Sequence, residues 1–124
     1  MGVFAALRAT RAFRRKNFDF LETREDCDLV LEIGFHQESG TPLTLKQLQQ
    51  MGITSVPTLQ RRLRRLRQVG AIVGRRSEED GRAVELALSP RLLRSYAKYG
   101  ELIRSLQVNG AAHPGTPEDD SSER

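Results

Sequence analysis

The chain has 124 residues, a net charge of +4, one cysteine and no tryptophan. This length predicts one small domain, and the few aromatic residues leave little to line a roomy ligand pocket. A single cysteine excludes an intramolecular disulfide and favours a cytoplasmic protein, while the arginine-rich, amphipathic segment 1–20 has an apolar run too short to cross a membrane.

Charge is segregated along the chain. Residues 1–18 carry five positive charges and no acid, residues 19–38 carry seven acids and one arginine, and residues 39–77 carry Lys46, seven arginines and no acid. A solvated helix face is the simplest explanation of such a basic block, and an anionic partner is the alternative. The stretch 19–32 is expected to cover a surface turned away from that partner. The tail, residues 109–124, has Gly, Pro, Ser and acids without apolar periodicity and is expected to be disordered.

Two helices are predicted before the basic block. Thr23 followed by Asp26 predicts the start of a helix in "TREDCDLVLEIGFHQ". Thr44 and Gln47 have the spacing of a capping box for a second, short helix, which Gly52 is placed to end. The apolar residues expected on the buried sides of these helices are Leu29, Val30, Ile33, Leu45, Leu48 and Met51.

A third helix, residues 55–69, contains five arginines within seven residues. Ser55 is a good N-cap, and Pro57 is tolerated in the first turn. Leucines recur at i, i+4 and i+7 on one side, at Leu59, Leu63 and Leu66. A short helix, a tight turn and a second helix with a basic outer face form a helix-turn-helix, which places its second helix in the DNA major groove.

A β-hairpin is predicted directly after the third helix. "AIVGRR" and "AVELALS" are short strand patterns, and the second alternates with Val84, Leu86 and Leu88 on one face. "SEEDGR", residues 77–82, joins them as a wing with an Asp-Gly turn. The fold class is therefore mainly α with a small β-hairpin, a winged helix-turn-helix over residues 21–89 with N- and C-terminal helices beside it.

This fold assigns roles to the polar residues. Gln60 and Arg61 are placed to read adenine and guanine, and Thr58 or Pro57 to pack on thymine methyl groups. Phosphate contacts are assigned to Arg64, Arg65, Arg75 and Arg76. At the wing, Arg82 is the candidate for the minor groove, with Asp80 to orient it; the alternative is that Asp80 and Gly81 only form the turn.

The span from about Leu43 to Pro90 resembles the MarR family of bacterial transcriptional regulators. The resemblance rests on a short helix, a glycine turn, a recognition helix ending in Leu-x-x-x-Gly, the Asp-Gly-Arg of the wing and a Leu-Ser-Pro exit. It implies that the residues from Ser55 to Arg62, Val56 and Arg62 included, face the major groove and that Arg82 is the wing arginine. Family members usually have two long C-terminal helices and an effector pocket, whereas only one such helix fits here.

That C-terminal helix, residues 90–108, begins at Ser89 and Pro90. It carries an apolar stripe at 4-3-4-3 spacing, formed by Leu92, Tyr96, Tyr99, Ile103 and Leu106. Such a stripe suits a helix partner. The partner is the N-terminal segment, the same helix of a second subunit, or both; a helix that only closes the monomer core is a further alternative. A homodimer is favoured because two recognition helices on a two-fold axis match a palindromic operator.

No catalytic chemistry stands out. No His, Cys, Asp or Glu set has metal-ligand spacing and no nucleophile motif is found, so we expect no metal, no cofactor and no enzymatic activity. Cys27 lies among Glu25, Asp26 and Asp28, which oppose a reactive thiolate, so it is expected to be a small buried residue rather than a peroxide sensor.

The sequence thus predicts a cytoplasmic, homodimeric, sequence-specific double-stranded DNA-binding transcriptional regulator, expected to be a repressor. It predicts no membrane association and identifies no small-molecule effector. The alternative is a winged helix used for protein interaction or as an accessory protein of a replication or partition complex. The acid-free span 39–77 favours DNA, because an interaction module would have little use for it.

Overall fold

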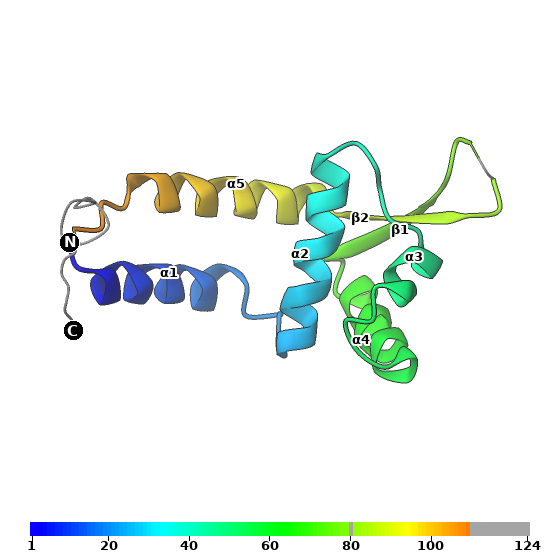
Figure 1. Cartoon of the computed structure of the whole chain (residues 1–124), viewed down its shortest axis with the longest axis horizontal. Coiled ribbons are helices and arrows are strands. Elements are labelled where there is room, and N and C mark those ends of the chain that lie inside the picture. Colours follow the sequence, from blue (N-terminus) through cyan, green and yellow to red (C-terminus); the bar gives the residue numbers. More distant parts are fainter. Residues whose placement is uncertain (80, 110–124) are drawn as a thin grey trace, which may run out of the picture. The chain divides into compact units, whose positions relative to one another are not determined.

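The structure is a computed structural model that describes residues 1–79 and 81–109 (Figure 1). It divides into two compact units, one made of Met1–Phe18 with the residues from Tyr96 onward, the other of Asp19–Ser95. Asp80, predicted to orient Arg82, and residues 110–124 of the predicted tail lie outside the described residues.

The unit Asp19–Ser95 begins with the three predicted helices, α2 (Arg24–Glu38), α3 (Leu45–Gln50) and α4 (Val56–Gln68). Their predicted caps are confirmed. Thr23 forms a capping box with Asp26, and Thr44 forms one with Gln47. The Ser55 hydroxyl accepts a hydrogen bond from the backbone N–H of Thr58, which starts α4 in the predicted place. These caps satisfy N–H groups that the first turn of a helix leaves unpaired.

The predicted hairpin is also confirmed. Strands β1 (Ile72–Arg76) and β2 (Val84–Leu88) pair antiparallel, with Ile72 opposite Leu88 and Arg76 opposite Val84. Leu86 and Leu88 are buried as the alternation predicted, but Val84, nearer the wing tip, is 39% exposed. Ala87 on the other face is buried as well, which the simple alternation did not predict.

Helix α2 packs closely on β2. A methyl group at Gly34 would lie 3.0 Å from Cδ1 of Leu88, and the side-chain oxygen of Gln37 accepts a 2.8 Å hydrogen bond from the Leu88 backbone N–H. The core of this unit consists of leucines, isoleucines and a valine from every element, with Leu29, Val30, Ile33, Leu48, Leu59, Leu66, Ile72 and Leu86 at most 1% exposed. Met51, expected on a buried side, is instead 42% exposed.

The unit of Met1–Phe18 and the residues from Tyr96 onward contains α1 (Val3–Asn17) and most of α5 (Pro90–Ser105); residues 90–95 of α5 belong to the unit Asp19–Ser95. The N-terminal helix of the predicted fold class is confirmed as α1, formed by the amphipathic segment. The start of α5 is as predicted, because the Ser89 hydroxyl accepts a hydrogen bond from the Leu92 backbone N–H. Within this unit the Asn109 backbone N–H donates to the Met1 carbonyl at 2.7 Å.

Candidate nucleic-acid interface

The buried side of α4 determines which of its residues face outward. Leu59, Leu63 and Leu66 are at most 5% exposed, so this side of the helix is fixed against the core of its unit. At about 100° per residue, Arg61 and Arg64 lie on the opposite side, and both are exposed. Neither forms an ion pair with another residue of the described ranges, so their guanidinium groups are accessible to an anion.

The N-terminal part of α4 is equally accessible. Ser55, Val56, Pro57 and Gln60 are exposed, and Thr58 is half-buried. The structure therefore brings together, at one end of one helix, the residues to which the sequence assigned contacts with bases.

The hairpin adds arginines to the same unit. Arg75 and Arg76 are exposed on β1, and Arg82 is exposed at the wing. Arg76 also stabilises the wing, because its Nη1 donates a 2.6 Å hydrogen bond to the carbonyl of Gly81 and so connects the wing loop to β1. The Ser77 backbone N–H also donates to the carbonyl of Ala83, which closes the base of the loop.

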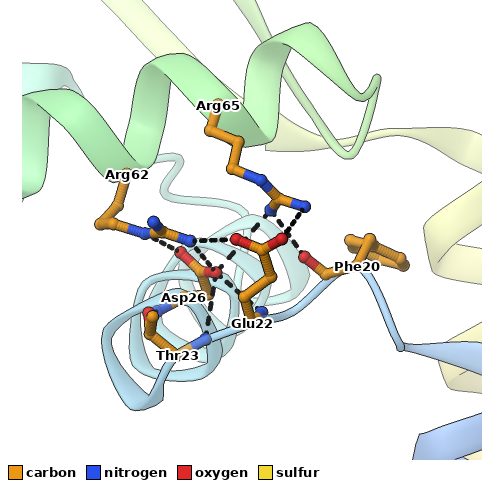
Figure 2. Close-up of polar contacts among 6 residues, drawn as sticks. All are labelled: Phe20, Glu22, Thr23, Asp26, Arg62 and Arg65. Carbon is orange, nitrogen blue, oxygen red and sulfur yellow. Dashed lines mark hydrogen bonds and ion pairs between the residues drawn. The ribbon is translucent and has the colours of Figure 1, made fainter.

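Two arginines of α4 are not free on the outer face. Figure 2 shows Arg62 reaching Asp26 of α2, whose side chain is completely buried. Arg62 Nε donates to Asp26 Oδ1 at 2.8 Å and Nη2 donates to Oδ2 at 2.6 Å, a bidentate pair. The same Nη2 lies 3.1 Å from Oε1 of Glu22. Only 15% of the Arg62 side chain is exposed, so this residue fastens α4 to α2.

Arg65 is held beside Arg62. Its Nη2 lies 2.9 Å from Oε2 of Glu22, and its Nη1 donates to the carbonyl of Phe20 at 2.7 Å (Figure 2). The sequence-based assignment of Arg62 and Arg65 to DNA stays a prediction; in this structure their guanidinium groups bind carboxylates and a carbonyl of their own unit. We call Glu22, Asp26, Arg62 and Arg65 the carboxylate clamp.

The protonation of the clamp follows from its contacts. Burial by itself would raise the pKa of Asp26, but the hydrogen bonds from Arg62 and from the backbone N–H groups of Glu22 and Thr23 outweigh it, so the pKa lies below its usual value. The hydrogen bonds to Asp26 and Glu22 raise the pKa of Arg62 in turn. Asp26 and Arg62 are therefore ionised at neutral pH.

The clamp was not predicted from the sequence, because Asp26 was already explained by its position at the start of the helix after Thr23. Its Oδ2 accepts from the Thr23 backbone N–H as part of the capping box, and the same atom also binds Arg62. The stretch 19–32 was expected to cover a surface turned away from DNA, and two of its acids contact arginines of the basic block. Glu22 precedes the N-cap Thr23 and lies outside α2, so helical spacing offered no signal for its contacts with Arg62 and Arg65.

Cys27 differs from its expectation too. It is exposed, not buried. The buried side of α2 is formed by Asp26, Leu29, Val30 and Ile33, and Cys27 lies about 100° from Asp26 around the helix. The periodicity of those four positions would have predicted its exposure.

In the unit that contains α1, part of the apolar stripe of α5 is covered within the chain. Phe18 stacks on Tyr96 with ring centroids 4.4 Å apart, and Phe13 stacks on Tyr99 at 5.3 Å. Arg14 Nη1 donates to the Tyr99 hydroxyl at 3.2 Å. The N-terminal segment is thus a partner of Tyr96 and Tyr99, which was one of the alternatives predicted for the stripe.

The remaining residues of the stripe differ in their exposure to solvent. Leu92 is buried, Leu106 is half-buried and Ile103 is 49% exposed. On α1 of the same unit, Phe4 is 76% exposed and Leu7 is 54% exposed. Large apolar side chains at the surface are candidates for contact with another protein.

Among the described residues, no group of three or more His, Cys, Asp or Glu side chains is placed to hold a metal ion. None of the helices in these ranges is long and apolar enough to cross a membrane.

Comparison with family models and with curated proteins finds no match. Solved structures do match. The S. aureus MepR-DNA complex aligns at 15% identity and a TM-score of 0.61, covering 82% of this chain and 76% of that chain. Reduced AbfR bound to DNA aligns at 23% identity and a TM-score of 0.51, covering 84% and 76%. The transcriptional regulator PA4135 aligns at 19% identity and a TM-score of 0.51, covering 82% and 73%. These neighbours are MarR-family regulators. At such identities the likeness concerns the fold, and this chain has the winged helix-turn-helix fold of MarR-family regulators.

Proposed function

We propose that this protein is a sequence-specific double-stranded DNA-binding transcriptional regulator that acts as a repressor in the cytoplasm, by binding rather than by catalysis. The observation that carries the proposal is the outer face of α4, where Arg61 and Arg64 are exposed, without an ion pair to any described residue, on a helix whose other side is fixed in the core. The likeness of the fold to MepR and AbfR, both solved with DNA, supports it.

We propose two kinds of contact with DNA. Thr58, Gln60 and Arg61, near the start of α4, are the proposed readers of base edges in the major groove, flanked by Ser55, Val56 and Pro57. Arg64 on α4 and Arg75 on β1 are proposed to bind phosphates, with Arg76 both shaping the wing and adding charge. Arg82 is the proposed minor-groove contact.

We propose further that the regulator is a homodimer. Phe4 and Leu7 on α1 and Ile103 on α5 are large, exposed apolar residues of one unit, and burial against a second copy would remove them from water. Tyr96 and Tyr99 support this surface from within the chain, because Tyr99 stacks on Phe13 of α1 and Tyr96 stacks on Phe18, which follows α1. A dimer offers two recognition helices, one for each half of a palindromic site.

A gel-shift titration tests the function. The protein is titrated against the DNA upstream of its own coding sequence and against a random duplex of equal length, at about 50 and about 200 mM salt. We expect tighter binding to the upstream DNA at both concentrations and weaker binding to both duplexes at the higher one. Arg61→Ala should reduce the preference for the upstream DNA. Failure of the wild type to bind either duplex at the lower salt would reject the proposal and favour the protein-interaction module.

A further inference from the structure

The two carboxylates of the clamp differ in their access to solvent. The Asp26 side chain is completely buried, whereas 51% of the Glu22 side chain is exposed. Their arginines differ in the same way, with 15% of Arg62 and 27% of Arg65 exposed. The pair of Asp26 and Arg62 is therefore internal, and the pair of Glu22 and Arg65 lies at the surface, where an ion in solution can compete with it.

Arg65 stands next to the proposed DNA-binding face. It follows Arg61 by four residues, so the two side chains are neighbours on the surface of α4. A phosphate bound beside Arg61 would lie within reach of a long side chain at that position. The guanidinium of Arg65 meets Glu22 through Nη2 at 2.9 Å, and carboxylate and phosphate oxygens bind such a group in the same manner.

We infer that Glu22 occupies Arg65 as an internal substitute for a DNA phosphate, and that Arg65 exchanges the carboxylate for a phosphate when DNA binds. This inference rests on the proposed function. The exchange leaves two contacts in place: Phe20 accepts from Arg65 Nη1 at 2.7 Å, and Asp26 keeps its bidentate pair with Arg62. α4 thus stays fastened to α2 while one guanidinium changes its partner.

If Arg65 exchanges Glu22 for a phosphate, neutralising Glu22 should increase the affinity for DNA. Glu22→Gln removes the 2.9 Å ion pair that a phosphate would have to displace from Arg65 Nη2, so binding to duplex DNA should be about two- to fivefold tighter, the range expected for an exposed ion pair. The gain should shrink as salt rises, because salt weakens exposed pairs. The melting temperature should stay equal or fall slightly, and a tighter complex cannot result from damage to the fold.

The experiment compares wild type, Glu22→Gln, Glu25→Gln, Arg65→Ala and the double variant Glu22→Gln with Arg65→Ala, using the full chain and one duplex. Glu25→Gln is the matched control, because it removes the same charge from the first turn of α2 where no ion pair joins it to a described arginine. We expect its effect to be smaller than that of Glu22→Gln. The gain from Glu22→Gln should vanish in the presence of Arg65→Ala.

The outcomes separate the two claims. If the wild type binds DNA but the affinity of Glu22→Gln is equal to that of Glu25→Gln or weaker than that of the wild type, the exchange is overturned and the proposed function stands. A gain that persists without Arg65 would overturn it as well. Failure of the wild type to bind either duplex overturns both claims.

Discussion

Asp26→Asn should destabilise the fold because Asp26 joins α2 to α4. The carboxylate accepts from Arg62 through both oxygens, at 2.8 and 2.6 Å, and its Oδ2 also accepts from the backbone N–H groups of Glu22 and Thr23. In the best placement of the amide that Asp26→Asn introduces, its oxygen takes the position of Oδ2 and its NH₂ faces Arg62 Nε. The hydrogen bond from Arg62 Nε is then lost, because two donors face each other. The hydrogen bond from Arg62 Nη2 remains, but its acceptor is no longer charged. A hydrogen bond to a charged group contributes about 1.5 to 3 kcal/mol, and a neutral one about half as much.

The expected loss is therefore about 3 kcal/mol of unfolding free energy, equivalent to about 10 °C in melting temperature for a chain of this length. Urea and thermal denaturation followed by circular dichroism at pH 7 would measure it, with Asp28→Asn as the control, since Asp28 has no ion pair to a described residue. A loss below about 0.5 kcal/mol, the usual effect of a surface substitution, would refute the view that Asp26 anchors α4.

The pKa of Asp26 gives this prediction a pH signature. Because the folded-state pKa is below that of the unfolded chain, the ionised carboxylate stabilises the fold fully above the unfolded value of about 3.9, and this stabilisation is lost as pH falls through the folded-state value. The difference between wild type and Asp26→Asn should be constant above about pH 5 and shrink below about pH 4. A difference that stays unchanged down to about pH 2 would contradict the ionised pair.

Three further predictions concern binding and assembly. Arg64→Ala should lower affinity on all duplexes alike and reduce the salt slope of log affinity by about one, whereas Arg61→Ala should cost about 1 to 3 kcal/mol at one base pair and little on random DNA; an equal loss on every sequence would make Arg61 a phosphate contact. Phe4→Glu combined with Ile103→Glu should give a folded monomer in sedimentation that binds a full operator poorly, and a wild type that sediments as a monomer at micromolar concentration would end this idea. Arg82→Ala should weaken binding more on operators with A·T-rich flanks than on G·C-rich ones, and equal losses on both would exclude the minor-groove role.

Much of the fold could be predicted from the sequence because its signals are local. The caps at Thr23, Thr44 and Ser55 each act over three residues of chain, so their spacing is visible in the sequence. The buried leucines of α4 follow the helical repeat, and the pairing of β1 with β2 joins neighbouring segments through a short wing. Each of these features is decided by residues that lie close together along the chain.

The sequence also located the basic helix, but it did not show which of its arginines are exposed and which are paired with carboxylates. It placed five arginines on α4, and charge by itself does not show which of them lie beside a carboxylate. Tertiary structure decided that Arg61 and Arg64 face outward while Arg62 and Arg65 bind Asp26 and Glu22.

The physical reason is distance along the chain. Arg62 and Asp26 are 36 residues apart, and Arg14 and Tyr99 are 85 apart, so these contacts exist only after the helices have packed. Packing orients each side chain to within a few degrees around its helix, and that orientation decides whether a guanidinium meets a carboxylate or solvent. The sequence by itself determined the helices, the hairpin and the sign of the charge, whereas only the packing of α2 on α4 decided which of these charges remain accessible to solvent.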